Sequence, residues 1–173
     1  MRRQKYLVHL PIVTFAILLI QGCAAVTRFE SQTPGTMLTV RGIGRMELPQ
    51  EARLDSKATG QHEFAATAPG GQTLYGVLPL RVNGGTMAVS ILLFAPALFI
   101  GGFRDVFPYY QMDPEAGLLR YKVREVDDWR LYKPTDAESN RAKLYFDKVG
   151  TLCKSEGGQG QPPAECAGPV ARR

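Results

Sequence analysis

The sequence predicts a mainly β protein with one C-terminal helix: a small antiparallel β-sandwich that carries an apolar, membrane-associated insertion. Three observations lead to this fold class. Between residues 34 and 83, short runs of β-branched and apolar residues alternate with Gly- and Pro-rich turn signals. Residues 84–103 contain no charged side chain, and residues 135–150 place apolar side chains at helical spacing. We therefore expect a β-rich domain over 34–150 with the insertion at about 87–103.

Residues 1–22 have the layout of a secretory signal peptide. Arg2, Arg3 and Lys5 form a basic start, an apolar run follows from Tyr6 to Ile20, and a small residue, Gly22, ends the segment. About 150 residues remain after removal of such a signal, which is enough for one domain with a core.

The four residues Ile20-Gln21-Gly22-Cys23 resemble the lipobox of bacterial lipoproteins. The resemblance implies that Cys23 is diacylated on sulfur, that the signal is cut before it, and that the new amino group is acylated. Ala24 follows rather than Asp, which implies the periplasmic face of the outer membrane, with the inner membrane as the alternative. The competing interpretation is an ordinary signal peptide or an uncleaved anchor, with Cys23 as a free thiol.

Charge and cysteine content narrow the possible partners. The signal holds three basic residues and no acid, so the formal charge of +5 falls to +2 in the remaining chain, which gives no electrostatic case for nucleic acid. Membrane lipid is the expected partner.

With Cys23 acylated, Cys153 and Cys166 remain, and we expect them to form a disulfide in an oxidising compartment. A metal site is the rival, and the spacing without a nearby His disfavours it.

We expect residues 23–33 to be a lipid-anchored tether and the strands to begin after Pro34. The segments 36–42, 51–56, 61–67 and 72–82 have strand composition, and the turn signals 68–71 and 83–85 separate them. Pro34-Gly35, Gly42, Leu48-Pro49 and Gly60 follow the order of turns in PEGA-type modules, so residues 33–83 resemble these small β-sandwich repeats of bacterial envelope proteins. The resemblance implies a fold and an envelope setting, and it implies no catalytic residue.

The uncharged stretch 87–103 allows three interpretations: a membrane-associated loop or hairpin, a buried core segment, or a transmembrane helix. We favour the first, because Pro96 near the centre removes a backbone hydrogen bond that lipid cannot replace. Phe103, Phe107, Tyr109 and Tyr110 follow it like an aromatic belt at headgroup level. The expected membrane-contacting side chains are Leu92, Leu93, Phe94, Leu98, Phe99 and Ile100. PEGA-type lipoproteins look similar here, with an Asp-containing segment (here Arg104-Asp105) behind an apolar insertion.

The rest of the chain is predicted to form a strand, a helix and a tail. Leu119, Tyr121 and Val123 alternate with basic residues, as in a strand with one buried face. Thr135 and Glu138 form a capping box that predicts the start of a helix, and Gly150 predicts its end. Residues 151–173 are expected to be a disordered or disulfide-tied tail.

The sequence contains no nucleophile elbow, phosphate loop, dinucleotide fingerprint or zinc-protease motif. His62 and Glu63 are neighbours, and in a strand they would point to opposite faces. We therefore expect no enzyme activity, no cofactor and no metal. The expected function is a structural or interaction role at the outer membrane. An accessory lipoprotein of a secretion, conjugation or polysaccharide-export machine, docked to an envelope membrane protein, is the alternative. A small hydrolase is a third, disfavoured one, and the sequence leaves the oligomeric state open.

Overall fold

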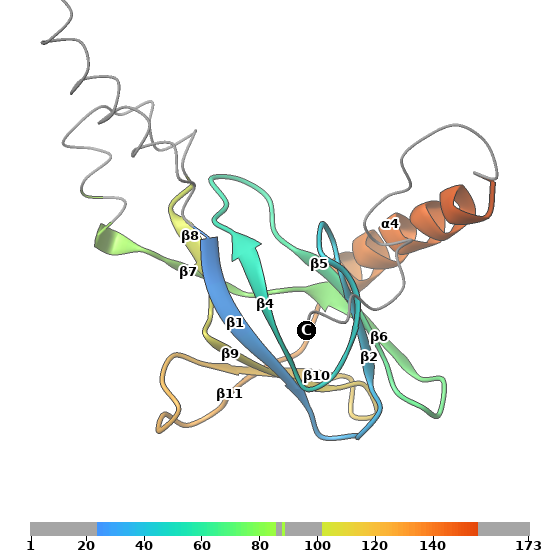
Figure 1. Cartoon of the computed structure of the whole chain (residues 1–173), viewed down its shortest axis with the longest axis horizontal. Helices are drawn as coiled ribbons and strands as arrows, with labels where there is room; N and C mark the ends of the chain where they lie inside the picture. Colours follow the sequence, from blue (N-terminus) through green and yellow to red (C-terminus); the bar gives the residue numbers. More distant parts are fainter. Residues whose placement is uncertain (1–23, 86–87, 89–101, 156–173) are drawn as a thin grey trace, which may run out of the picture.

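Two β-sheets, a short strand pair and a long helix make up the part of the chain that the structure describes (Figure 1). The computed structural model describes residues 24–85, 88 and 102–155. The strands are β1 (Ala24–Ser31), β2 (Met37–Val40), β3 (Gly44–Glu47), β4 (Gln50–Asp55), β5 (Glu63–Thr67), β6 (Thr73–Val77), β7 (Leu80–Val82), β8 (Arg104–Val106), β9 (Tyr109–Asp113), β10 (Leu118–Lys122) and β11 (Arg130–Tyr132), and the helix is α4 (Asp136–Ser155). The prediction of a mainly β chain with a C-terminal helix is confirmed.

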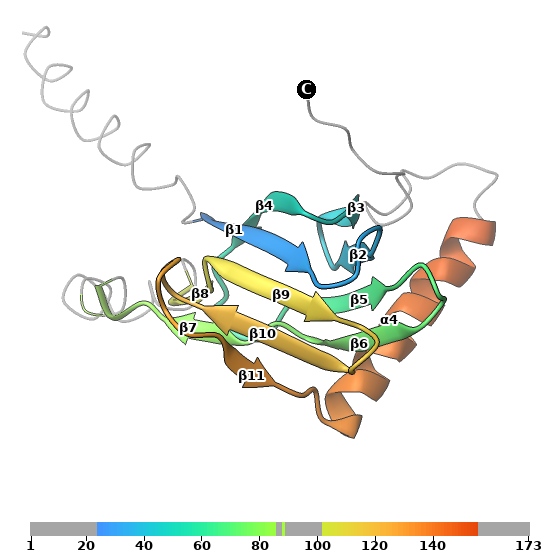
Figure 2. The same cartoon turned by 90° about the horizontal axis from the view of Figure 1, so that it is seen from below.

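The two sheets contribute to one hydrophobic core. The five-stranded sheet has the order β11-β10-β9-β1-β4, the four-stranded sheet has the order β3-β2-β5-β6, and β7 pairs with β8 (Figure 2). Alternate side chains point inward, as a strand with one buried face requires. Fully buried members of the core are Phe29, Leu38, Val40, Phe64, Ala66, Leu78, Tyr110, Met112 and Leu119.

The prediction of a tether over residues 23–33 is wrong, because residues 24–31 form β1. This strand lies inside the five-stranded sheet, antiparallel to β4 on one side and parallel to β9 on the other. Thr27 and Phe29 are buried, whereas Val26 is 54% exposed. Only these two side chains of the segment point inward, which is a weak periodic signal for a strand. The strand is stabilised by hydrogen bonds to β4 and β9, which the local sequence does not reveal. The parallel β1–β9 pair also departs from the expected wholly antiparallel arrangement.

The prediction that four aromatic residues form a belt at headgroup level is wrong for two of them, Phe107 and Tyr110. Phe107 is 8% exposed and Tyr110 is fully buried. The Tyr110 hydroxyl donates to the Pro79 carbonyl (2.5 Å) and accepts from the Phe107 N–H (3.0 Å). Burial raises the pKa of Tyr110 far above its ordinary value. A tyrosine whose hydroxyl is satisfied in this way belongs to the core rather than to a headgroup layer.

The segment 72–82 forms two strands instead of one. β6 ends at Val77, and the Leu78 N–H donates to the His62 carbonyl (2.9 Å), the last hydrogen bond in register with β5. Pro79 follows and has no N–H to offer. The chain then leaves the four-stranded sheet and pairs as β7 with β8.

The capping box is confirmed at the start of α4. The Thr135 N–H donates to Glu138 Oε2 (2.8 Å), and the Glu138 N–H donates to Thr135 Oγ1 (3.3 Å). The helix continues beyond Gly150 to Ser155, so the predicted end and the predicted tail boundary at 151 are wrong. A single glycine costs a helix only about 1 kcal/mol relative to alanine, which does not terminate it.

Buried and charged contacts attach α4 to the four-stranded sheet. Ala142 is fully buried, and Ser139 Oγ donates to the Tyr75 carbonyl (3.0 Å). The buried Glu63 carboxylate lies 3.7 Å from Arg141 of the helix and 3.3 Å from Arg41 of the sheet. The Arg41 guanidinium also lies 4.6 Å from the centroid of the Tyr145 ring. The helix is therefore fixed to the sheet along its first three turns.

Replacing Phe29 with alanine tests whether β1 is a core strand. The Phe29 ring is fully buried and stacks on Tyr110, with centroids 5.4 Å apart. We expect Phe29→Ala to lower the free energy of unfolding by about 3–5 kcal/mol, measured by urea denaturation. Val26→Ala, on the exposed face of the same strand, is the control and should cost less than about 0.5 kcal/mol. Equal, small effects would mean that β1 is only a tether.

Candidate functional site

The start of β1 and the described residues just before and just after 86–101 lie at one end of the molecule (Figures 1 and 2). Ala24 pairs with Asp55 at the end of β4. Beyond β4, Lys57 and Arg104 exchange two backbone hydrogen bonds, of 2.8 and 3.1 Å. The Asn83 N–H donates to the Phe103 carbonyl (2.8 Å), which joins the chain before the stretch to the chain after it. We call this region the proximal end: Ala24, Asp55–Lys57, Val82–Asn83 and Gly102–Arg104.

Gly102 allows the returning chain to pass close to the end of β4. Its φ is +70°, and a Cβ at this position would lie 2.7 Å from the Ser56 carbonyl oxygen. Such a distance is well inside van der Waals contact, and the positive φ adds strain for any other residue. The glycine thus fixes where the apolar stretch rejoins the domain.

A buried carboxylate connects the three segments of the proximal end. Asp105 of β8 is 8% exposed. Its Oδ1 accepts from the Ser56 hydroxyl (2.5 Å), and its Oδ2 accepts from the Asn83 amide (2.8 Å). Both oxygens of the buried acid therefore have partners, one from the chain after β4 and one from the chain after β7. Asp105 holds together the two ends of the apolar stretch and the end of β4.

Arg104 organises the loop after β4 on the other side of the same strand pair. Its Nη2 donates to the carbonyls of Gly60 (2.8 Å) and Ala58 (3.4 Å), while its Nε is buried without a partner among the described residues. Lys57 and Arg81 add two further basic side chains here, and Asp55 is the exposed acid. Counting Arg81 and Asp105, which adjoin the region in β7 and β8, three basic side chains stand against two acids here.

The side chains of the predicted site residues fall outside the described part of the chain. Cys23 is bonded to Ala24, the first residue of β1. The expected membrane-contacting side chains Leu92, Leu93, Phe94, Leu98, Phe99 and Ile100 fall within 89–101. The side chains of Cys153 and Cys166 are also outside the described part, so the predicted disulfide stays a prediction. No helix among the described residues is long and apolar enough to cross a bilayer.

The neighbours His62 and Glu63 are both buried but contact different partners. The His62 Nε2 lies 3.1 Å from the Asp55 carbonyl, so the neutral ring donates there. Glu63 instead faces the guanidinium groups of Arg41 and Arg141. Across residues 24–85 and 102–155, no cluster of three His, Cys, Asp or Glu side chains is placed to hold a metal ion.

Two surface pockets lie elsewhere. One of about 250 Å³ opens between β3 and β4, lined by Val26, Met46 and Arg53 among others. The other, of about 300 Å³, lies under the C-terminal half of α4 and includes Thr39, Tyr75 and Phe146. His62 lines neither pocket, and neither holds a pair of titratable groups in acid–base contact.

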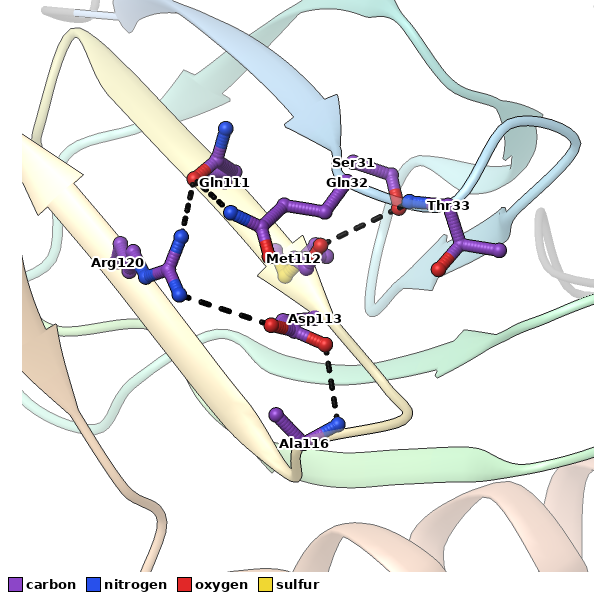
Figure 3. Close-up of polar contacts among 8 residues, drawn as sticks. All are labelled: Ser31, Gln32, Thr33, Gln111, Met112, Asp113, Ala116 and Arg120. Carbon is purple, nitrogen blue, oxygen red and sulfur yellow. Dashed lines mark hydrogen bonds and ion pairs between the residues drawn. The ribbon is translucent and has the colours of Figure 1, made fainter.

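A polar network at the opposite end of the five-stranded sheet has a structural role (Figure 3). Arg120 Nη1 donates to Gln111 Oε1 (3.0 Å), and its Nη2 lies 3.7 Å from Asp113. Asp113 Oδ1 also accepts from the Ala116 N–H (3.0 Å) in the β9–β10 turn. The Ser31 hydroxyl donates to the Met112 carbonyl (3.2 Å). These contacts join the ends of β1, β9 and β10, and the charged groups satisfy one another.

Sequence reasoning did not assign a role to Ser56, Asn83 or Asp105. Asp105 entered only as part of the Asp-containing segment Arg104-Asp105 behind the insertion, and nothing in the local sequence indicates that it is buried. The contacts that define the site join residues 22 and 49 positions apart in sequence. No local pattern encodes such separations. No protein-family model, curated protein or solved structure matches this chain.

Removing the Asp105 carboxylate should loosen the proximal end. We expect Asp105→Ala to lower the free energy of unfolding by about 2–3 kcal/mol, because two hydrogen bonds to a buried charged group are lost. Urea denaturation measures the change. Asp128→Ala removes an exposed acid and serves as the control, with an effect below about 0.5 kcal/mol. If the two variants were equally stable, Asp105 would not connect the segments.

The pKa of His62 predicts a pH-dependent stability. Burial, with a smaller contribution from the Lys57 charge, lowers the pKa of His62 from its ordinary value of 6.5. As the pH falls below 6.5, His62 of the unfolded chain binds a proton before His62 of the folded chain does. The free energy of unfolding therefore decreases as the pH falls from 6.5 towards the folded-state pKa of His62. Urea midpoints at pH 7.5 and 5.5 should differ for the wild type and differ less for His62→Gln. An unchanged pH dependence in the variant would contradict this assignment.

Proposed function

We propose that this protein is a non-catalytic, lipid-anchored envelope protein with a structural or interaction role at the periplasmic face of the outer membrane. In this proposal, acyl chains on Cys23 and the apolar stretch 87–103 bind the same bilayer. The observation that carries it is the proximal end, where the start of β1 lies near the residues just before and just after 86–101. Two membrane contacts that start at one end of a domain can enter one membrane together.

Because β1 begins directly after Cys23, acyl chains on Cys23 would orient the domain as well as attach it to the membrane. Adjacent Cα atoms are about 3.8 Å apart, so acyl chains on Cys23 would hold the first residue of β1 at the membrane surface. Each buried methylene contributes about 0.8 kcal/mol, and chains on both sulfur and nitrogen make the anchor long-lived. Lys57 and Arg81 would then lie near the headgroups, where basic side chains are favourable next to anionic lipid.

The fold supports an envelope module of the PEGA type. We propose that the two sheets, which share one core, pack as a β-sandwich. Gly35, Gly42 and Gly60, three of the turn positions on which the resemblance depends, have φ values of 76°, 84° and 76°. Ala24 after the cysteine supports the outer membrane as the destination. The separate partners of His62 and Glu63 support a non-catalytic role.

Lipid labelling and flotation test the two membrane contacts separately. Labelled palmitate should enter the wild type and be absent from Cys23→Ser. A chain that starts at Ala24, without signal or lipid, should still float with liposomes through the apolar stretch. The double change Leu93→Asp with Phe99→Asp should abolish flotation, because each buried apolar side chain contributes about 1.5–3 kcal/mol. Circular dichroism should show that the β-domain is unchanged.

Leu144→Asp is the matched control, since Leu144 is 71% exposed on α4. It should leave flotation intact. Equal labelling of wild type and Cys23→Ser would contradict acylation. Unfolding of the double variant would mean that the stretch belongs to the core. Release from liposomes with retention in native membranes would favour the alternative role, in which the stretch docks to an envelope membrane protein.

A further inference from the structure

The outer edge of β4 has no neighbouring strand among the described residues. β4 is the last strand of the five-stranded sheet, and β1 is the strand that pairs with it (Figure 2). β3, which precedes β4 in the chain, is likewise the last strand of the four-stranded sheet. An edge strand presents backbone N–H and C=O groups with which another extended segment can pair.

The hydrogen bonds of β1 show which backbone groups of β4 point outward. The Arg28 N–H donates to the Pro108 carbonyl (2.8 Å), just before β9, so the backbone groups of Arg28 face β9. Successive residues of a strand direct these groups to opposite sides, so those of Thr27 face β4, where Ala52 lies opposite. The backbone of Ala52 therefore faces β1, and that of the residue on either side of it faces away from the sheet.

Glu51 and Arg53 are these two outward-facing residues. The Glu51 carbonyl receives one exposed hydrogen bond, from the Gln50 side-chain amide at 3.4 Å. The open part of the edge ends before Asp55, whose carbonyl accepts from the His62 ring (3.1 Å). A segment opposite residues 51–53 can therefore pair with this edge through its own N–H and C=O groups.

A pocket of about 250 Å³ runs along the same edge, and its apolar wall includes Ile43, Met46 and Ala52. Ile43 and Ala52 are half-buried, and Met46 is buried. Ala52 lies opposite the buried Thr27, so its side chain is on the inner face of the sheet. A residue that pairs with Ala52 in an added strand would place its side chain on this face, in the gap between β3 and β4. The pocket thus favours an aliphatic side chain at that position.

The side chains of Glu51 and Arg53 give the edge a charge order. Both are exposed and lie on the opposite face of β4 from Ala52. In the part of the chain that the structure describes, neither forms an ion pair. Opposite charges across neighbouring strands stabilise pairing, and like charges destabilise it. An antiparallel segment that complements the edge therefore reads acidic, apolar, basic from its N-terminus, because it meets Arg53 first.

We propose that the outer edge of β4 binds an extended segment of a partner protein, which adds to the five-stranded sheet as an antiparallel strand. An acidic, an apolar and a basic residue of the segment lie opposite Arg53, Ala52 and Glu51. The inference rests on the interaction role in the proposed function and names the class of partner for it. In such strand addition, main-chain hydrogen bonds provide affinity and side-chain pockets provide specificity.

The peptide acetyl-Thr-Glu-Ile-Lys-Thr-amide tests the proposal on the full-length protein in detergent micelles. Hydrogen exchange measured by NMR should show that the Glu51 and Arg53 N–H groups become protected when the peptide is added. The Ala52 N–H should be protected with or without the peptide, because it faces β1.

N-methylated peptides test the direction of the hydrogen bonds. In the proposed register, the N–H groups of the peptide Glu and Lys face β4, whereas that of the peptide Ile faces away. N-methylation of the Lys should raise the dissociation constant about tenfold, measured by fluorescence anisotropy of a labelled peptide. N-methylation of the Ile is the matched control and should change it less than about twofold.

A charge exchange tests the order of the side chains. Arg53→Glu should weaken binding of this peptide about fivefold, because two acids then lie opposite each other. A peptide with Lys in place of its Glu should restore the affinity for this variant. Arg130→Glu, at an exposed residue on the other edge strand of the same sheet, is the control and should leave the affinity of the original peptide unchanged.

Three outcomes would overturn the inference. These are equal weakening by the two N-methyl groups, no protection of Glu51 and Arg53 by the peptide, and protection that appears without peptide as the protein concentration rises. The last of them would assign the edge to a second copy of this chain. All three would leave the lipid labelling and flotation results standing, whereas a failure of those experiments with intact peptide binding would overturn the membrane anchor alone.

Discussion

The structure depends on the burial of Phe29 against Tyr110. These rings stack with an interplanar angle of 16° and are both fully buried. Phe29 belongs to β1 and Tyr110 to β9, so the stack joins the first strand of the chain to a strand that follows the apolar stretch. The Tyr110 hydroxyl extends this connection to Pro79, just before β7. One aromatic pair thereby fixes the parallel β1–β9 contact and the position of the strand that leads into the stretch.

This arrangement makes the proximal end a rigid base. β1 is hydrogen-bonded on both edges, and Thr27 Oγ1 donates to the Phe107 carbonyl (2.7 Å). Asp105 then draws Ser56 and Asn83 together. A lipid attached to Cys23, as proposed, would transmit orientation as well as attachment, because β1 begins at the next residue, Ala24. A tethered domain could turn freely on its anchor, whereas this domain, anchored as proposed, would present one fixed face to the membrane.

The four-stranded sheet and α4 are positioned away from this base. Gly76 allows the chain before the helix to lie against β6, since a Cβ there would be 2.7 Å from the Pro134 ring. Glu63 then connects the sheet to the helix through Arg41 and Arg141. A surface formed by α4 is thus available on the side of the domain that the proposed orientation leaves free of lipid.

The sequence by itself determined the features that depend on residues close together in the chain. Glycines and prolines mark the turns around 42 and 68–71, alternation marks β10 with Leu119 buried, and the Thr135–Glu138 capping box marks the start of α4. Each depends on residues a few positions apart, so short-range chemistry specifies it. The resemblance of residues 20–23 to a lipobox and the uncharged stretch are also local patterns, and the proposed function draws on both.

The tertiary structure alone decided which of these elements meet. β1 looked like a tether because its inward residues, Thr27 and Phe29, are few, and its stability comes from β4 and β9. Phe107 and Tyr110 looked like a membrane belt because a sequence does not show whether an aromatic ring faces lipid or a core. The proximal end could not be predicted, since Asp105 contacts Ser56 and Asn83 across 49 and 22 residues. Contacts at such separations follow from how the whole chain packs, because no short-range pattern specifies them.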